Sequence, residues 1–178
     1  MQNHEPLKNV LIAFAYHGFK KASMAVLAAA ADVSRQTLYN RFKTKDAVLD
    51  WAVGGYIDYL RNQLLASLEC DDDTVSDALL TGFCRLMGDD VTLMHESPYG
   101  AEIMELGTNS LRAFEEDPIH RIEMDIAAFL LDHGICEASK EAEEKAFLLV
   151  MSAKGLMVKA RSYDEFKAGM SRLICAAL

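Results

Sequence analysis

The chain of 178 residues is 51% hydrophobic, which is enough apolar sequence to form a buried core and argues against intrinsic disorder. It contains three prolines and no run of eighteen apolar residues, and its N-terminal stretch MQNHEPLK lacks the apolar segment of a signal peptide. Neither membrane insertion nor secretion is therefore expected, and a cytoplasmic protein is predicted. The four cysteines lie far apart without a CxxC pair, so buried thiols are favoured over disulfides or a zinc site.

The formal net charge of −9 argues at first against DNA as a partner, because phosphate binding needs a positively charged surface. The charge is unevenly distributed, however. Residues 1–50 carry seven Lys and Arg against four Asp and Glu, a net charge of +3, and the rest of the chain carries −12. A small basic module joined to a larger acidic one is expected where one end of a protein meets DNA and the other does not.

Apolar residues recur at helical spacing along nearly the whole chain, and no alternating segment persists long enough for a strand. The sequence therefore predicts an all-α protein, with a three-helix helix-turn-helix domain over residues 1–46 and a larger helical domain over residues 47–178. The border lies within a long fourth helix, so the two domains are expected to be mechanically continuous. The side chains predicted to cap helix N-termini include Ser23, Ser34 and Thr44. The predicted helices span residues 5–17, 24–31, 35–41, 45–69, 75–88, 98–115, 118–133, 140–160 and 163–177.

Residues 23–50 form the most informative segment, in which two short helices flank a turn at residues 31–34. Leu38 and Phe42, four residues apart, are predicted to face inward as an apolar pair, and Val33 is predicted to fill the turn. Asp32 tolerates the left-handed backbone conformation that such turns often use. In the helix at 24–31, the residues predicted to face the helix at 35–41 and to let the two backbones approach closely are Leu27, Ala28 and Ala31.

An inward orientation of Leu38 and Phe42 directs Gln36 and Asn40 outward. Their side-chain amides can pair with adenine in a major groove, where the Thr37 methyl group can meet thymine. The surrounding cations suit phosphates or guanine, and the backbone amides at the start of the fourth helix offer another phosphate site. The residues predicted to bind DNA are Ser34, Arg35, Gln36, Thr37, Tyr39, Asn40, Arg41, Lys43, Thr44 and Lys45. The alternative is a compact helical hairpin whose polar face is merely solvated.

Several short motifs occur together in this part of the chain: Gly18-Phe19, Leu27-Ala28, Val33-Ser34, Thr37-Leu38-Tyr39, Phe42 and Lys45-Asp46. In this combination the sequence resembles the TetR family of bacterial transcriptional regulators, over roughly residues 7–53. The resemblance implies a three-helix DNA-binding unit whose third helix enters the major groove, a dimer, and an all-helical C-terminal ligand domain. It also implies that Tyr39 and Lys45 stand at positions that typically contact phosphate, and that residues 35–37, 40 and 41 belong to the reading helix.

The sequence departs from the family pattern at three positions. Asp32 and Gln36 stand where glycine is frequent, and Arg41 stands where histidine is common. These differences concern the operator sequence rather than the fold. Beyond residue 53 the resemblance is one of architecture only, so the remaining helices are interpreted from their own residues.

Two apolar stripes near the C-terminus predict a homodimer. Small residues at 140–160 let helices pack closely, and a second stripe follows on the last helix. Paired across a two-fold axis, the stripes would form the four-helix interface that TetR-like proteins typically use. The alternative is that both stripes belong to the core of one chain. The residues predicted at the interface are Ala146, Val150, Ala153, Met157, Phe166, Met170, Leu173 and Ile174.

Methionines and aromatic residues gather between residues 75 and 133 and predict a pocket for a small apolar ligand, because methionine-rich walls are deformable. The alternative is an ordinary helical core. The predicted lining residues are Phe83, Met87, Met94, His95, Tyr99, Met104, Phe114, Met124 and Phe129. The histidines lack metal-ligand spacing, and the sequence has neither a phosphate-binding glycine loop nor an HExxH or GxSxG motif, so no metal, cofactor or enzymatic activity is expected.

Together these features predict a ligand-responsive repressor that places two reading helices in successive major grooves of a palindromic operator. A ligand that favours the DNA-incompetent arrangement would release the DNA, with the helix at 45–69 as the connecting element. Two other functions stay open. One is a ligand-independent DNA-organising protein with the same N-terminal module, and the other is a helical enzyme or carrier whose basic end is incidental.

Overall fold

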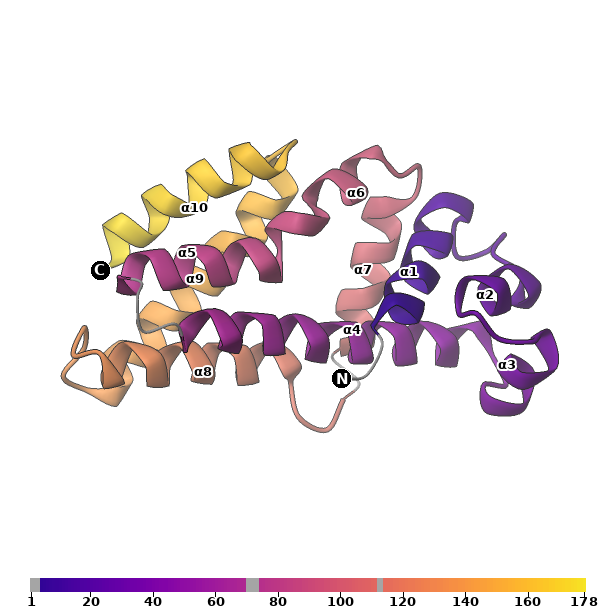
Figure 1. Cartoon of the computed structure of the whole chain (residues 1–178), viewed down its shortest axis with the longest axis horizontal. Coiled ribbons are helices and arrows are strands. Elements are labelled where there is room, and N and C mark those ends of the chain that lie inside the picture. Colours follow the sequence, from indigo (N-terminus) through magenta and orange to yellow (C-terminus); the bar gives the residue numbers. More distant parts are fainter. Residues whose placement is uncertain (1–3, 70–73, 112–113) are drawn as a thin grey trace. The chain divides into compact units, whose positions relative to one another are not determined.

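The computed structural model describes residues 4–69, 74–111 and 114–178, and this part of the chain contains helices and no strands (Figure 1). The predicted all-α fold is confirmed. The sequence predicted residues 89–97 to lie outside the helices, but most of this segment belongs to η1 and α6. The elements are α1 (Glu5–His17), α2 (Met24–Ala30), α3 (Arg35–Arg41), α4 (Lys45–Leu68), α5 (Val75–Leu86), η1 (Gly88–Asp90), α6 (Val91–Glu96), α7 (Gly100–Leu111), α8 (Pro118–Asp132), α9 (Ser139–Lys159) and α10 (Tyr163–Ala177).

Polar side chains cap the N-termini of the short helices, as predicted. The Ser23 hydroxyl accepts a hydrogen bond from the Val26 amide at 3.3 Å, and the Ser34 hydroxyl accepts one from the Thr37 amide at 3.0 Å. Thr44 does the same at the start of α4, where its hydroxyl lies 3.1 Å from the Ala47 amide. Each cap satisfies a backbone donor that has no partner within its own helix.

The chain folds into two compact units. The N-terminal unit consists of Met1–Tyr59 and Leu93–Asp117, and the C-terminal unit consists of Leu60–Thr92 and Pro118–Leu178. The division between them crosses α4 after Tyr59, and α7 belongs to the same unit as α1, α2 and α3. A functional border at residue 46 stays a prediction, since these units are defined by packing alone.

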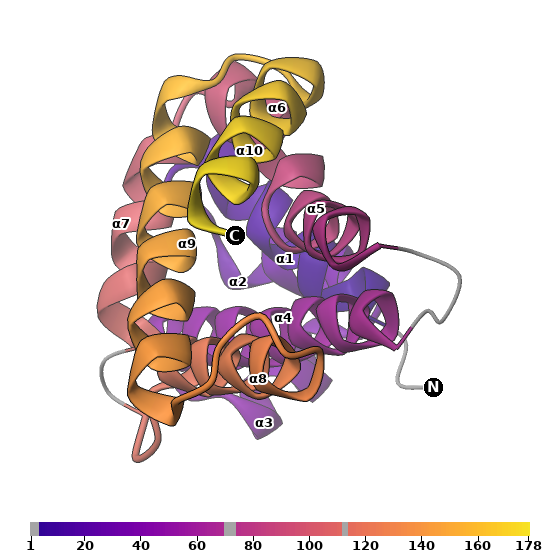
Figure 2. The same ribbon diagram turned by 90° about the vertical axis from the view of Figure 1, so that its left-hand side faces the viewer.

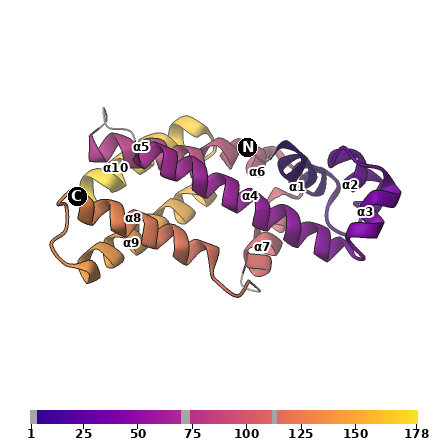
Figure 3. The same ribbon diagram turned by 60° about the horizontal axis from the view of Figure 1, so that its bottom comes forward.

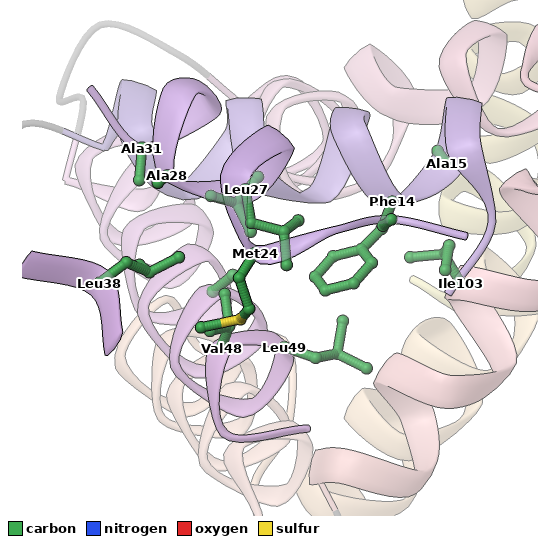
Figure 4. Close-up of a cluster of buried hydrophobic side chains, with 13 residues drawn as sticks. Phe14, Ala15, Met24, Leu27, Ala28, Ala31, Leu38, Val48, Leu49 and Ile103 are labelled. Atoms are coloured by element: carbon green, nitrogen blue, oxygen red, sulfur yellow. The ribbon is translucent and has the colours of Figure 1, made fainter. Parts of the chain in front are cut away.

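A single apolar core holds the N-terminal unit together (Figure 4). Val10 and Phe14 of α1, Leu27 of α2 and Val48 of α4 are fully buried in it. Ile103 of α7 is also buried in this core, so a segment far along the chain completes the packing of the first four helices. Burial of this kind supplies most of the stability of short helices.

The C-terminal unit is built from α5, α8, α9 and α10 together with the end of α4. Figure 2 shows α10 beside α5 and α9, and Figures 1 and 3 show α8 running alongside α9. Phe83, Phe166 and Met170 are fully buried in its core. The Arg61 guanidinium forms a bidentate pair with the Asp125 carboxylate, at 2.5 and 2.8 Å, and so fixes the end of α4 to α8.

The cysteines agree in part with the buried thiols that the sequence suggested. Cys84 and Cys136 are buried, Cys175 is exposed, and Cys70 lies outside the described residues. Burial raises the pKa of the Cys84 thiol, and a hydrogen bond with Tyr163 only partly offsets it, which keeps this thiol protonated. Within the described ranges, no helix is both long and apolar enough to cross a membrane.

The start of α7 tolerates no side chain. A Cβ atom on Gly100 would lie 2.0 Å from the Met94 carbonyl oxygen, which belongs to the backbone and cannot rotate away. Gly100→Ala is therefore expected to lower the free energy of unfolding by about 1–3 kcal/mol, as overpacking typically does. Chemical denaturation would measure the change.

Ala101→Ser is the matched control, because Ala101 is exposed on the same turn of α7. Its unfolding free energy is expected to stay within about 0.5 kcal/mol of the wild-type value. Equal stability of the Gly100→Ala variant and this control would contradict the close approach of the two backbones.

Candidate nucleic-acid interface

The turn between α2 and α3 has the backbone geometry predicted for it. Asp32 has a φ of 54° and is the one non-glycine residue with positive φ in the described part of the chain. The Val33 amide donates a hydrogen bond to the Ala28 carbonyl at 3.0 Å, which closes the turn. The Val33 side chain, however, is 39% exposed, so the prediction that it fills the turn is wrong. The turn is closed by a backbone hydrogen bond rather than by a buried side chain.

The orientation of α3 agrees with the prediction. Leu38 is buried and Phe42 is half-buried, whereas Gln36 and Asn40 are exposed. Figure 4 shows Leu38 pointing from α3 into the core. The surface of α3 away from the core therefore presents two side-chain amides, which can donate and accept hydrogen bonds at once.

Thr37 lies on the flank of this surface and has its hydroxyl occupied. The Thr37 and Ser34 hydroxyls are 2.8 Å apart, and the Ser34 hydroxyl also accepts the Thr37 amide. The Thr37 hydroxyl therefore takes part in the cap of α3, and the residue is exposed.

Aromatic rings position the arginines that border the amide face. The Arg35 guanidinium lies 5.5 Å from the centre of the Tyr39 ring. The Arg41 guanidinium lies 5.1 Å from the centres of both the Phe42 and Trp51 rings. Such cation–π contacts hold a guanidinium group in place, while its N–H donors stay available for other partners. The role of Trp51 was not predicted, because it lies ten residues from Arg41, in another helix.

Lys45 has a different environment from the other predicted DNA-binding cations. Its ammonium group donates hydrogen bonds to the carbonyl oxygens of Phe19 at 2.7 Å and Lys20 at 2.9 Å. It also lies 5.1 Å from the centre of the Phe19 ring. Lys45 is half-buried, whereas Lys43 in the preceding turn is exposed.

The predicted dimer stripe is largely core, which is the alternative that the sequence left open. Its fully buried members are Ala146, Val150, Ala153, Phe166, Met170 and Ile174. These side chains contact the neighbouring helices of their own subunit and have no surface left for a partner, so their assignment to an interface is wrong. Only Met157 and Leu173 of the predicted set are partly exposed.

A second apolar face of α9 points away from that core. We define this exposed α9 face as Phe147, Leu148, Met151 and Val158, which are 37–57% exposed. The four residues follow helical spacing, and a Cβ on Gly155 between them would meet nothing within 4 Å. The run of consecutive apolar residues at 146–151 was the signal for two apolar faces on one helix.

The predicted pocket residues are divided between the two compact units. In the C-terminal unit Met124 is exposed, and the other three are buried, namely Phe83, Met87 and Phe129. In the N-terminal unit Phe114 is exposed, and the other four are half-buried, namely Met94, His95, Tyr99 and Met104. Their assembly into one ligand pocket stays a prediction.

Two of the predicted pocket residues, Tyr99 and Phe114, pack against other parts of the N-terminal unit. The Tyr99 amide donates a hydrogen bond to the Ala15 carbonyl at 2.9 Å, and a Cβ on Gly18 would lie 3.1 Å from the Tyr99 ring. The Phe114 ring packs against Gly54 so closely that a Cβ there would lie 2.6 Å from it. The Tyr99 ring therefore packs at the C-terminal end of α1, and the Phe114 ring packs on α4.

Comparison with known proteins identifies the N-terminal segment. Residues 11–51 match the family model described as bacterial regulatory proteins of the tetR family. This range includes α2, the turn, α3 and the start of α4, and therefore every residue of the predicted DNA-binding set. No curated protein matches the chain significantly.

Solved structures match over nearly the full chain. A protein from Mesorhizobium loti assigned to the TetR family of transcriptional regulators has a TM-score of 0.67 at 19% identity, covering 98% of this chain and 93% of its own. A transcriptional regulator from Rhodococcus sp. has a TM-score of 0.63 at 20% identity, covering 100% and 96%. The TetR-family regulator CifR, as a cysteine mutant complexed with operator DNA, has a TM-score of 0.58 at 18% identity, covering 99% and 97%. The predicted resemblance is confirmed: residues 11–51 match the tetR-family model, and the fold of the chain is similar to that of solved TetR-family transcriptional regulators.

Proposed function

We propose that the protein is a cytoplasmic DNA-binding transcriptional regulator that binds a palindromic operator as a homodimer and acts as a repressor. The observation that carries this function is the exposed face of α3, where Gln36 and Asn40 are bordered by Arg35 and Arg41 in a segment that matches the TetR family. A similar fold binds operator DNA in CifR. The uncharged amides suit base edges, and the cations around them suit phosphates.

The exposed α9 face is the surface that we assign to dimerisation. An apolar stripe of this size on a helix surface is typical of an interface, since isolated apolar side chains are common on surfaces but aligned ones are not. A two-fold axis across α9 would bury Phe147, Leu148 and Met151 against the same residues of a second copy. Such a dimer would carry two reading helices, one from each subunit, as the two half-sites of a palindromic operator require.

Ligand response is the third part of the proposal. The helix α4 begins directly after α3 and continues past Tyr59, where the division between the compact units falls. A ligand held by the C-terminal unit could therefore act on the position of α3 through α4, provided that it binds the DNA-free arrangement more tightly. The sequence favours a small apolar ligand.

Substitutions on α3 separate base recognition from phosphate contact. Asn40→Ala is expected to weaken the binding free energy by about 1–3 kcal/mol for the duplex that the wild-type protein selects from a random library. Its binding free energy for an unrelated duplex is expected to change little. Tyr39→Ala is expected to weaken binding to both duplexes alike, because a phosphate contact carries no sequence information. Fluorescence anisotropy titrations would measure the four affinities.

Ser171→Ala, at an exposed position of α10, is the control and should bind both duplexes as the wild type does. Unchanged affinity of the Asn40→Ala and Tyr39→Ala variants for the selected duplex would refute the assignment of α3 as the reading helix.

Leu148→Glu tests the dimer interface. In the dimer, this change would replace a buried leucine by a carboxylate on each subunit and would bring two like charges together. The dimer dissociation constant is therefore expected to rise at least about tenfold. Sedimentation velocity over a range of protein concentrations would measure it, and circular dichroism would show that the subunit stays folded.

Lys140→Glu introduces the same charge at an exposed polar position of α9 and should leave the dimer intact. A dimer of unchanged affinity in the Leu148→Glu variant would exclude the exposed α9 face as the interface.

A further inference from the structure

We infer that Trp51 is a positioning residue for DNA binding, although it lies outside the predicted DNA-binding set. Its indole ring, together with the Phe42 ring, holds the Arg41 guanidinium at the end of α3, in a place from which the guanidinium contacts a DNA phosphate. The inference rests on the proposed DNA-binding function and deepens it. The contacts of Arg41 with the two aromatic rings carry it.

The first argument is the geometry of the three groups. The Arg41 guanidinium lies 5.1 Å from the centre of each ring, and the two ring centres are themselves 5.1 Å apart with a tilt of 35°. The guanidinium therefore contacts an aromatic pair rather than a single ring. Both distances are within the range of about 6 Å over which a cation is attracted to an aromatic face, and tryptophan gives the strongest attraction.

The second argument is that the aromatic pair is fixed by packing, whereas Arg41 is not. Trp51 and Phe42 are half-buried and pack against the core of the N-terminal unit, and Arg41 is exposed. Leu49 and Ala52, which neighbour Trp51 on α4, are buried in the same core. A long exposed side chain loses rotamer freedom when it binds, and a guanidinium that is already held against fixed rings loses less of it. The rings therefore pre-organise Arg41 for a partner.

The third argument is the place of Arg41 on α3. With about 100° between successive residues of a helix, Arg35 and Arg41 lie about 60° to either side of the inward-facing Leu38. The two arginines are therefore on opposite flanks of α3, and Gln36 and Asn40 face outward between them. A helix in a major groove has a phosphate backbone on each side, so cations on its flanks suit phosphates and its outer face suits bases. Arg41 is accordingly assigned to a phosphate contact.

The experiment is a double-mutant cycle in the full-length protein. It compares Trp51→Leu, Arg41→Gln and the double variant with the wild type, and it includes Trp51→Phe, which keeps an aromatic ring. Fluorescence anisotropy of labelled DNA measures binding to the duplex that the wild-type protein selects and to an unrelated duplex, over a series of salt concentrations. The cycle is informative because the effects of two residues that act together do not add.

Arg41→Gln is expected to lower the magnitude of the slope of log K against log salt by about 0.9 for each subunit bound, as the loss of one phosphate contact does. Trp51→Leu is expected to weaken binding to both duplexes at least about fivefold, because a phosphate contact carries no sequence information. Trp51→Phe is expected to bind within about twofold of the wild type. In the Arg41→Gln background, Trp51→Leu is expected to change the affinity by less than about twofold.

Three results would overturn the inference. They are an unchanged salt slope in Arg41→Gln, a Trp51→Leu loss that is as large in the Arg41→Gln background as in the wild type, and equal losses in Trp51→Leu and Trp51→Phe. The second result is what a merely structural role of Trp51 would produce, because a folding defect does not depend on Arg41.

A measurement without DNA tests the contact itself and needs no substitution of Trp51. Trp51 is the only tryptophan of the chain, so its indole N–H gives one NMR signal. Arg41→Gln is expected to shift this signal, and Lys43→Gln, which removes an exposed charge two residues away, is expected to leave it in place. An unchanged signal in Arg41→Gln would also overturn the inference. Failure of the wild-type protein to select any duplex would instead refute the proposed function, and the indole signal would still decide whether Arg41 contacts Trp51.

Discussion

The length of the two helices at the proposed DNA surface is the constraint on which the N-terminal unit depends. The helices α2 and α3 have seven residues each, fewer than an isolated helix needs to be stable in water. They stay helical because Leu27 and Leu38 are buried in a core shared with α1, α4 and α7. The orientation of Gln36 and Asn40 is therefore a property of the whole unit, including Ile103 far along the chain, and not of the motif alone.

Local signals made this part of the molecule predictable from sequence. The caps at Ser23 and Ser34, the inward pair of Leu38 and Phe42 and the left-handed Asp32 each involve residues within a few positions of one another. Physical rules for such neighbours act along one helix or turn, so they need no knowledge of the fold. Val33 was misjudged because its role depends on whether the side chain or the amide closes the turn.

Contacts between distant segments could not be obtained in this way. Periodicity predicted that Ala146, Val150 and Ala153 would be buried, but it does not say whether the covering surface belongs to the same chain or to another copy. The resemblance placed Lys45 beside a phosphate, but it gave no sign of the hydrogen bonds that its ammonium group donates to the carbonyl oxygens of Phe19 and Lys20, more than twenty residues earlier. The division of the predicted pocket residues between two units was likewise invisible in a sequence window.

The helix α9 has one apolar face inside its own subunit and another outside it, and this arrangement has a thermodynamic consequence. Burying the outer face against a second copy would stabilise the native state but not the unfolded chain. By mass action, the fraction of folded protein would then increase with the number of copies in the cell. A regulator built in this way is most vulnerable to unfolding and proteolysis when it is scarce, so the strength of its control over DNA would depend on its own abundance through stability as well as through occupancy.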